Sequence, residues 1–185
     1  MADVWLITGI PGAGKTTAAR LLAASFERGV HIQGDLLLEW ILAGRVWPRD
    51  EPRAEASRQV RLTIRNQCLL ARSYADAGFT PVIDYVIASR SVLHEFLGQL
   101  TGLDAYLVML SPGKAVAIER DLTREKGQQA KADRGVGIAE YWAYLEDDMK
   151  AELGGTGFWV GNARLSPEQT VAVILANRER AHLRT

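Results

Sequence analysis

Short runs of consecutive apolar residues alternate with longer, mixed segments along this chain. The apolar runs are typical of strands buried on both faces, because they lack the alternation of a half-exposed strand. We expect strands over residues 4–8, 30–33, 80–86, 104–110 and 157–161. Strands of this kind, separated by helices, indicate a parallel sheet with helices on both faces. The pattern predicts an α/β fold, and because we find no internal repeat or linker we expect one domain over residues 1–185.

Helices are expected between these strands. The expected ranges are 15–26, 35–43, 54–78, 89–100, 112–125, 138–152 and a last helix that begins at Ser166. Ser166 and Pro167 suit the N-cap and the first helical position of that last helix. Residues 44–53 contain two prolines and are expected to form a loop.

The stretch RDLTREKGQQAKADRG, residues 120–135, fits neither pattern. Eight of its sixteen residues are charged, and Leu122, Ala130 and Ala132 are its only apolar side chains. This composition is typical of a segment that does not fold by itself. From composition alone, the stretch is either a disordered linker or a mobile flap.

The overall composition is that of an ordinary globular protein, with 48% hydrophobic and 24% charged residues. The formal net charge is zero, so we expect neither a nucleic-acid partner nor a membrane surface, and any basic site must be local. No run approaches the roughly 18 apolar residues of a membrane span, and no secretory signal is visible. The single cysteine, Cys68, cannot form an internal disulfide, and we expect a reducing, cytoplasmic location.

Between the first strand and the first helix stands GIPGAGKT, residues 9–16, which fits the pattern G-x-x-x-x-G-K-[ST]. Glycines let such a loop approach a phosphate closely, and backbone N–H groups at the helix N-terminus attract the anion. Lys15 is expected to reach the β and γ phosphates of ATP, and the Thr16 hydroxyl to ligate Mg²⁺. The alternative is a glycine turn that only joins strand to helix. The candidate nucleotide-binding residues of the loop are Gly9, Pro11, Gly12, Ala13, Gly14, Lys15, Thr16 and Thr17.

Two aspartates follow other strands of the expected sheet. Because the carboxyl ends of parallel strands share one edge, both should lie near the phosphate loop. Asp84 closes PVID and suits a residue that holds Mg²⁺, directly or through water; the alternative is a cap in the following loop. Asp35, in HIQGD, could act as the general base on an attacking hydroxyl. Its alternative role is the N-cap of the helix that follows.

Together, GIPGAGKTT, the GD after the second strand, the VID of the third and an R-x-x-x-R before a lid resemble the small P-loop kinases. The chain is most similar to their chloramphenicol phosphotransferase-like and zeta-toxin-like group, which has AAA-type ATP binding. The resemblance implies a three-layer P-loop NTPase fold with a central, parallel, five-stranded sheet, helices on both faces and a small lid. It also implies that the third strand lies beside the first, which would bring Asp84 next to the phosphate loop.

The same resemblance implies roles for residues outside the loop. Asp35 matches the acid proposed as the base in chloramphenicol phosphotransferase, and Arg120 and Arg124 match lid arginines. Asp133 and Arg134 match an Asp-Arg pair in the same lid. The lid, about residues 120–136 and here called the lid segment, is longer than in those kinases, and residues 40–75 differ from them.

We expect the lid segment to order only when ATP is bound. Arg120 and Arg124 lie four residues apart, so on one helix they would share a face and reach one anion together. Arg120, Arg124 and Arg134 are candidate phosphate contacts, and Gly127 and Gly135 candidate hinges.

The leading hypothesis is a Mg·ATP-dependent kinase that phosphorylates a hydroxyl of a small molecule. Its catalytic residues would be Lys15, Asp35, Arg120 and Arg124, and its metal ligands Thr16 and Asp84. A nucleoside, nucleotide or nucleotide-sugar kinase is the first alternative, and a nucleotide-binding regulatory switch the second. No N-K-x-D guanine signature supports the switch. The pattern does not indicate the acceptor or the oligomeric state.

Other side chains have two readings each. We expect the arginines of the long helix to form a solvated face rather than to bind an anionic substrate; they are Arg58, Arg61, Arg65 and Arg72. We expect at least one of Trp40 and Trp47 to pack in the core, although both could line an acceptor site. Tyr85, Ser89 and Arg90, just past Asp84, are positioned for acceptor contacts. His31 is expected to be structural, and a zinc site is not expected.

Overall fold

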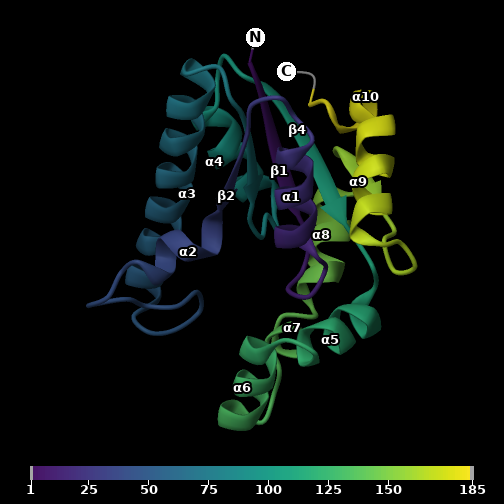
Figure 1. Cartoon of the computed structure of the whole chain (residues 1–185). Coiled ribbons are helices and arrows are strands. Elements are labelled where there is room, and N and C mark those ends of the chain that lie inside the picture. The colour runs from purple at the N-terminus through teal and green to yellow at the C-terminus, as the bar shows by residue number, and fades with distance from the viewer. Residues whose placement is uncertain (1, 184–185) are drawn as a thin grey trace.

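Five strands form a wholly parallel sheet in the computed structural model of this chain, which describes residues 2–183 (Figure 1). The strands are β1 (Asp3–Thr8), β2 (Gly29–Gln33), β3 (Thr80–Asp84), β4 (Asp104–Leu110) and β5 (Phe158–Val160). They lie in the order β2-β3-β1-β4-β5. The expected α/β class, the five strands and the place of β3 beside β1 are confirmed.

β1 is the central strand and is buried on both faces. Its residues Val4, Trp5, Leu6 and Ile7 are all fully buried, as the continuous apolar run predicts. Ile7 pairs with Asp84 of β3 on one side and with Val108 of β4 on the other. β1 therefore ends at the point where the strand order changes direction, which in α/β sheets is where ligands bind.

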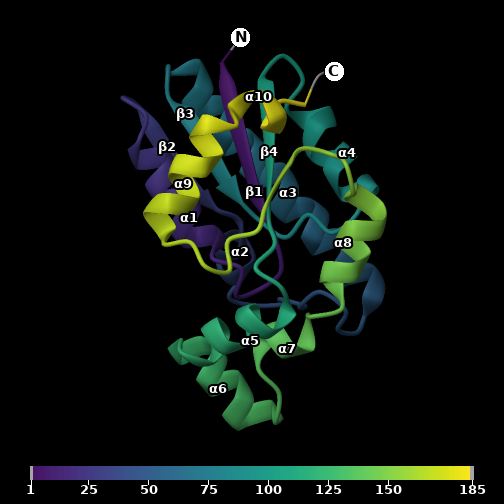
Figure 2. The same cartoon turned by 90° about the vertical axis from the view of Figure 1, so that its right-hand side faces the viewer.

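Helices cover both faces of the sheet. They are α1 (Lys15–Ala24), α2 (Gly34–Glu39), α3 (Arg53–Asp76), α4 (Arg90–Gln99), α5 (Lys114–Leu122), α6 (Glu125–Arg134), α7 (Ile138–Tyr141), α8 (Leu145–Leu153), α9 (Pro167–Ala176) and α10 (Arg178–Ala181). Figure 2 shows α1 and α9 on one face and α3, α4 and α8 on the other. This is the three-layer arrangement of the P-loop NTPase fold. Within the described part of the chain, no helix is both long and apolar enough to cross a membrane.

Helices α5, α6 and α7 extend beyond the carboxyl edge of the sheet, on the side where β1 meets α1 (Figures 1 and 2). The loop that joins α2 to α3 reaches the same side (Figure 1). Two segments that extend from the sheet, α5 to α7 and the loop between α2 and α3, therefore lie around the carboxyl end of β1 (Figure 1).

Three expectations about helices need correction. The helix expected over 138–152 is two helices, because residues 142–144 lie in a turn between α7 and α8. The helix expected over 35–43 ends at Glu39. Residues 125–134, expected to lack structure without ATP, form α6. Its Lys131 pairs with Glu140 at 2.9 Å and its Lys126 with Glu39 at 3.0 Å, so α6 contacts neighbouring elements through ion pairs.

The hinge expected at Gly127 is also wrong. Gly127 lies in the first turn of α6 and is buried, and an added Cβ would lie 2.1 Å from the carbonyl oxygen of Asp121. This glycine therefore permits a close contact between α6 and the end of α5, and the chain does not bend there. Gly135 ends α6 in the left-handed conformation, with φ of 72°, where glycine is favoured.

The start of α9 is confirmed at Pro167, with Ser166 as its N-cap. The Ser166 hydroxyl accepts a hydrogen bond from the Gln169 N–H, and the Gln169 side chain accepts one from the Ser166 N–H, which completes a capping box. The helix packs beside α1, the helix that follows the phosphate loop (Figure 2). The cap therefore anchors a helix that supports the site.

We predict that Ser166→Ala lowers the free energy of unfolding by about 1 kcal/mol, because the first turn of α9 loses its cap. Urea unfolding followed by circular dichroism measures the change. Ser73→Ala, at an exposed position inside α3, is the matched control and should cost nothing. Equal losses in the two variants would show that the cap has no special role.

Candidate active site at the carboxyl edge of the sheet

The phosphate loop joins β1 to α1 and is packed, backbone to backbone, against β4 and α5. Gly12 has φ of 82°, and an added Cβ would lie 2.1 Å from the Ala117 carbonyl oxygen in α5. At Gly9 an added Cβ would lie 2.5 Å from the Leu110 carbonyl oxygen at the end of β4. Both positions therefore require glycine, on steric grounds alone. The loop is held in one shape, and the first N–H groups of α1, which have no partner inside the helix, open onto the edge of the sheet.

Asn162 ties this loop to the last third of the chain, and sequence reasoning missed it. Its side-chain Nδ2 donates to the Ala13 carbonyl oxygen at 3.0 Å, and the residue is buried in the loop after β5. Arg120, in α5, donates to the carbonyl oxygens of Asn162 and Ala163 at 2.9 and 3.1 Å. Arg120, a predicted phosphate contact, thus connects the lid segment to the loop after β5, and Asn162 connects that loop to Ala13.

Lys15 begins α1 and is buried, with 8% of its surface exposed. Its Nζ donates to the Ile10 carbonyl oxygen at 3.3 Å, a long and weak bond. Burial lowers the pKa of its ammonium, while Asp35 and Asp84 raise it. A buried ammonium that is held mainly by one carbonyl favours the arrival of an anion. Pro11 lies partly buried in the loop, and Thr16 and Thr17 are exposed in the first turn of α1.

Asp84 ends β3 and is buried next to the phosphate loop, as the topology predicts. His31, on the neighbouring strand β2, places its Nε2 3.0 Å from Asp84 Oδ2. A proton on Nε2 therefore makes a hydrogen bond that holds the carboxylate in place. The carboxylate contacts His31, and Ser89 is the N-cap of the helix after the loop, so the alternative role of Asp84 as a cap is wrong. His31, which we expected to have a structural role, contacts the Asp84 carboxylate and so helps to position it.

Asp35 lies in the first turn of α2, and Gln33 occupies the N-cap position, so the role of Asp35 as an N-cap is wrong. The Asp35 side chain remains accessible to water, yet protein atoms crowd it. This partial removal from solvent raises the pKa of the Asp35 carboxyl, and Lys15 opposes the effect by lowering it. Asp84 adds a further increase, because two carboxylates near each other resist double ionisation.

Two neighbours explain the glycine of the GD pair. An added Cβ on Gly34 would lie 2.4 Å from Gln67 Oε1 and 2.7 Å from the ring of Tyr85. Gln67 is fully buried in α3, and neither end of its amide has a protein partner. The hydroxyl of Tyr85 is held protonated, because burial raises its pKa and Asp35 raises it further. Gln67 and Tyr85 thus form polar packing next to Asp35.

Arg120 and Arg124 do not share a helical face, which corrects the expectation drawn from their spacing. Helix α5 ends at Leu122, and Arg124 has extended backbone, with φ of −99° and ψ of 143°, before α6. The Arg124 guanidinium pairs with the carboxylate of Asp121. This pair lies near enough to Lys15 for Arg124 to lower the pKa of that ammonium and for Asp121 to raise it.

Asp121 connects the parts of the lid segment. It is buried, with 1% of its surface exposed, and its Oδ2 accepts a hydrogen bond from the Ala139 N–H of α7 at 2.9 Å. Its carbonyl oxygen accepts from the Arg124 N–H at 3.0 Å and lies against Gly127 of α6. One carboxylate therefore joins α5, α6 and α7. Nothing in the run of charges around Asp121 distinguishes it from its exposed neighbours before the fold is known.

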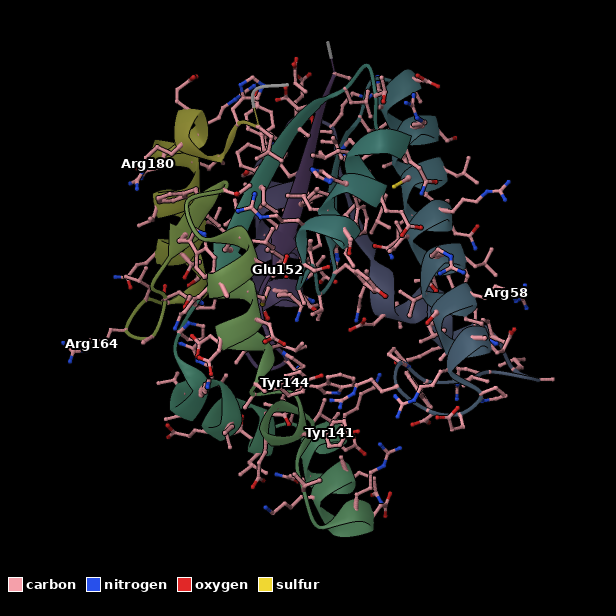
Figure 3. The ribbon with its side chains drawn as sticks, turned by 180° about the vertical axis from the view of Figure 1, so that it is seen from behind. Arg58, Tyr141, Tyr144, Glu152, Arg164 and Arg180 are labelled. Atoms are coloured by element: carbon pink, nitrogen blue, oxygen red, sulfur yellow. The ribbon has the colours of Figure 1, made fainter. Side chains whose placement is uncertain are left out.

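Arg134 is not brought to the phosphate loop. It is exposed in the last turn of α6, the helix farthest from the sheet in Figure 1. The Arg58 side chain pairs with Glu55 and points away from the sheet on the outer side of α3 (Figure 3), as a solvated face predicts. Arg72 instead packs inward and donates to the carbonyl oxygens of Gln99 and Thr101. A cavity of about 520 Å³ lies at the amino edge of the sheet, beside Gly157 and His182, and is not part of this site.

Comparison with known proteins shows the family and the fold of this chain. A family model described as the AAA domain matches residues 4–137. Among solved structures, the fold is similar to a sugar kinase from Janibacter sp. HTCC2649, at 17% identity and a TM-score of 0.65 over 98% of this chain and 96% of that one. It is also similar to the Deinococcus radiodurans tunicamycin resistance protein, at 19% identity and a TM-score of 0.65 over 100% of both chains.

A gluconokinase from Sinorhizobium meliloti 1021 is similar as well, at 16% identity and a TM-score of 0.62 over 96% of this chain and 92% of that one. At such identities the likeness shows the fold alone. No curated protein matches the chain. The comparisons bear out a P-loop kinase-like domain, whereas the finer similarity to the chloramphenicol phosphotransferase-like group is not among them.

We predict that Asp121→Asn loosens the lid segment selectively, because the ion pair with Arg124 is lost and the bond from Ala139 is weakened. Bonds to charged groups of this kind contribute about 1–3 kcal/mol. Hydrogen exchange measured by mass spectrometry should show faster exchange of amides in α6 and α7 and unchanged exchange in β1. Asp133→Asn, an exposed residue of α6, serves as the control. Faster exchange throughout the sheet would contradict a local role.

Proposed function

We propose, from the premise that the chain belongs to the AAA domain family, that it is an ATP- and Mg²⁺-dependent kinase acting on a hydroxyl of a small molecule. The observation that carries the proposal is the place of Lys15. Its ammonium is buried, and Asp35 and Asp84, at the same edge of the sheet, act to raise its pKa. Phosphoryl transfer needs mainly positioning and charge stabilisation, and this edge offers both. The kinases among the similar folds support a phosphotransferase.

The loop residues are proposed to hold the phosphates of ATP. The ammonium of Lys15 would exchange its weak bond to Ile10 for contacts with the β and γ phosphates. The other proposed contacts come from the loop and the first turn of α1, namely Gly9, Pro11, Gly12, Ala13, Gly14, Thr16 and Thr17. Phosphate binding would thereby satisfy groups that the protein leaves poorly satisfied.

Mg²⁺ is proposed to bind through Thr16 and Asp84. Mg²⁺ favours oxygen ligands and usually takes only one or two from the protein, the others coming from phosphates and water. The exposed hydroxyl of Thr16 and the carboxylate of Asp84 fit that requirement. Among residues 2–183, no three or more His, Cys, Asp or Glu side chains gather into a cage of their own. When bound, the ion neutralises negative charge on the phosphates.

Asp35 is proposed as the general base. Its carboxyl is accessible to an entering molecule. Asp84 raises the pKa of this carboxyl and Lys15 lowers it, so both lie close to it. A raised pKa makes the carboxylate a stronger base at neutral pH than an ordinary aspartate. The acceptor hydroxyl would give its proton to Asp35 while its oxygen attacks the γ phosphorus and ADP leaves.

The lid arginines are proposed to stabilise the transferring charge. Arg124 is the best placed for this role, because its guanidinium lies near enough to Lys15 to lower the pKa of that ammonium. Arg120 would join it after giving up a carbonyl partner, and Arg134 would approach only if α6 moved toward the phosphate loop. Closing the lid segment, residues 120–136, would exclude water and limit wasteful hydrolysis.

We also propose the finer assignments that the resemblance implies. The match of Asp35 and of the lid arginines favours an antibiotic-phosphotransferase-like kinase, and the similar fold of a tunicamycin resistance protein agrees with this. The similar fold of a sugar kinase likewise agrees with a small-molecule hydroxyl as acceptor. A nucleoside, nucleotide or nucleotide-sugar kinase is the second candidate. A regulatory nucleotide switch is the third. A single domain that works in the cytoplasm, where ATP is available, completes the proposal.

We predict that Lys15→Ala slows phosphoryl transfer by about 10²–10³-fold, because the transferring phosphate loses its main cation. Production of ADP should be slow without an acceptor, rise with an added hydroxyl compound, and fall in the variant. Lys114→Ala is the control, since Lys114 pairs with Asp147 outside the loop. Hydrolysis that responds to a partner protein, with no phosphorylated product from any acceptor, would favour the switch.

We predict that Asp35→Asn lowers kcat by about 10²–10⁴-fold with little change in the KM for ATP. The base acts only when deprotonated, so the wild-type rate should fall as the pH falls through the pKa of Asp35. Because that pKa is raised, the fall should begin at a higher pH than for an ordinary aspartate, and Asp35→Asn should abolish this limb. Asp76→Asn, exposed at the end of α3, is the control. An unchanged pH–rate profile would rule out Asp35 as the base.

A further inference from the structure

Large apolar side chains are exposed on two segments at the carboxyl edge of the sheet. One segment is α2 with the loop after it, and the other is the end of α7 with the turn that follows it. We call these side chains the aromatic patch; they are Leu36, Trp40, Leu42, Trp47, Tyr141 and Tyr144. Trp40 is 68% exposed and Tyr141 48% exposed, so burial in the core does not account for them. The expectation that Trp40 or Trp47 packs in the core is therefore wrong.

The two segments are joined directly, although they are far apart in the sequence. The Arg49 Nη1 donates to the Tyr144 hydroxyl at 2.7 Å, and the guanidinium lies 5.0 Å from the centre of the Tyr144 ring and 5.7 Å from that of Trp142. Arg49 adopts φ of 74°, which is uncommon outside glycine. Figure 3 shows Tyr141 and Tyr144 between α8 and α6, on the side of the loop after α2. Arg49 therefore brings the loop after α2 into contact with the turn after α7.

The cations of this surface already have protein partners. Arg45 donates to the Glu39 carbonyl oxygen at 3.0 Å, and its guanidinium lies 4.7 Å from the ring centre of Trp47. Lys126, from α6, lies 3.0 Å from the Glu39 carboxylate. Arg49 is engaged by Tyr144. Lys126 is paired with a carboxylate; Arg45 and Arg49 keep their charge, but each donates to a protein oxygen and lies over a ring. An anion would have to compete with these partners, whereas the ring faces of the aromatic patch are open, which favours an uncharged ligand.

The patch begins next to the proposed base. Asp35 lies at the start of α2 and Trp40 directly after its end, about 8 Å further along the helix axis at 1.5 Å per residue. Glu39 and Lys126 both influence the pKa of Asp35, which places the edge of the patch in the electrostatic surroundings of that carboxyl. A ring-sized molecule resting on the patch could therefore bring a hydroxyl to Asp35.

Large apolar side chains left exposed near a candidate active site favour a ligand-binding role for them. We infer that the aromatic patch binds the acceptor, and that this acceptor is a neutral molecule whose hydroxyl is carried on a ring with an apolar face. The inference rests on the proposed kinase function and adds the class of substrate. The ring stacks on the tryptophan and tyrosine side chains, while the Arg49–Tyr144 contact holds the two segments around it.

Binding is tested by saturation-transfer NMR on the full chain with Mg·ADP and three probes. Phenyl β-D-glucopyranoside is neutral and has a ring with an apolar face, phenyl phosphate has the same ring with a charge, and glycerol has hydroxyls without a ring. We expect binding of the glucoside and weaker or no binding of the other two. Trp40→Ala and Tyr144→Ala should each weaken the glucoside by about five- to tenfold.

Tyr74→Ala is the matched control, because Tyr74 is 40% exposed and Tyr144 is 38% exposed, but Tyr74 lies in α3 and packs on Phe79. Equal weakening in this control, equal binding of phenyl phosphate, or no binding of the glucoside would overturn the inference. Analytical sedimentation of the wild type and of Trp40→Ala tests whether a second copy of the chain binds to the patch instead. A dimer that is lost in the variant would assign the patch to a second copy of the chain and also overturn it.

A parallel assay separates this inference from the kinase proposal. ATP consumption is measured with a panel of neutral cyclic alcohols, acyclic alcohols and phosphorylated alcohols. Transfer to cyclic alcohols, with a raised acceptor KM and an unchanged ATP KM in Trp40→Ala, supports both. Transfer only to acyclic or phosphorylated members keeps the kinase and removes the aromatic-patch inference. Absence of any transfer, with ATP bound, removes the kinase itself and with it the acceptor assignment.

Discussion

A lysine ammonium buried at the end of the central strand is the electrostatic constraint that organises this site. Burial lowers the pKa of Lys15, and Asp35, Asp84 and Asp121 each act to raise it. These carboxylates come from three different segments of the chain. The sheet order and the close packing of the phosphate loop bring them to one place, so the fold and the charge balance of the site depend on each other.

Much of this arrangement is readable from local patterns. Continuous apolar runs identify all five strands because a buried parallel strand has no polar face to interrupt it. The glycine loop identifies the end of β1, and the Ser166–Pro167 pair identifies the start of α9, because each uses chemistry confined to a few neighbouring residues. The edge that Asp35 and Asp84 share follows from parallel topology alone.

The features that could not be predicted from the sequence depend on contacts between distant segments. Asp121 and Asn162 are ordinary polar residues in the sequence, and their roles arise from partners 18 and 149 positions away. The spacing of Arg120 and Arg124 misleads because α5 ends between them, at a turn stabilised by tertiary contacts. The exposed tryptophans look like core residues, since composition does not say which apolar side chains a fold leaves uncovered.

The bonds of Asn162 have a mechanical consequence. A continuous relay runs from Arg120 in α5 to the backbone of residues 162–163, and from the Asn162 side chain to Ala13 in the phosphate loop. A swing of α5 that keeps these bonds must pull on the loop, whereas a swing that breaks them releases it. Movement of α5 would thus be transmitted to the phosphate loop by hydrogen bonds, through a segment that lies outside residues 4–137, which the AAA domain model matches.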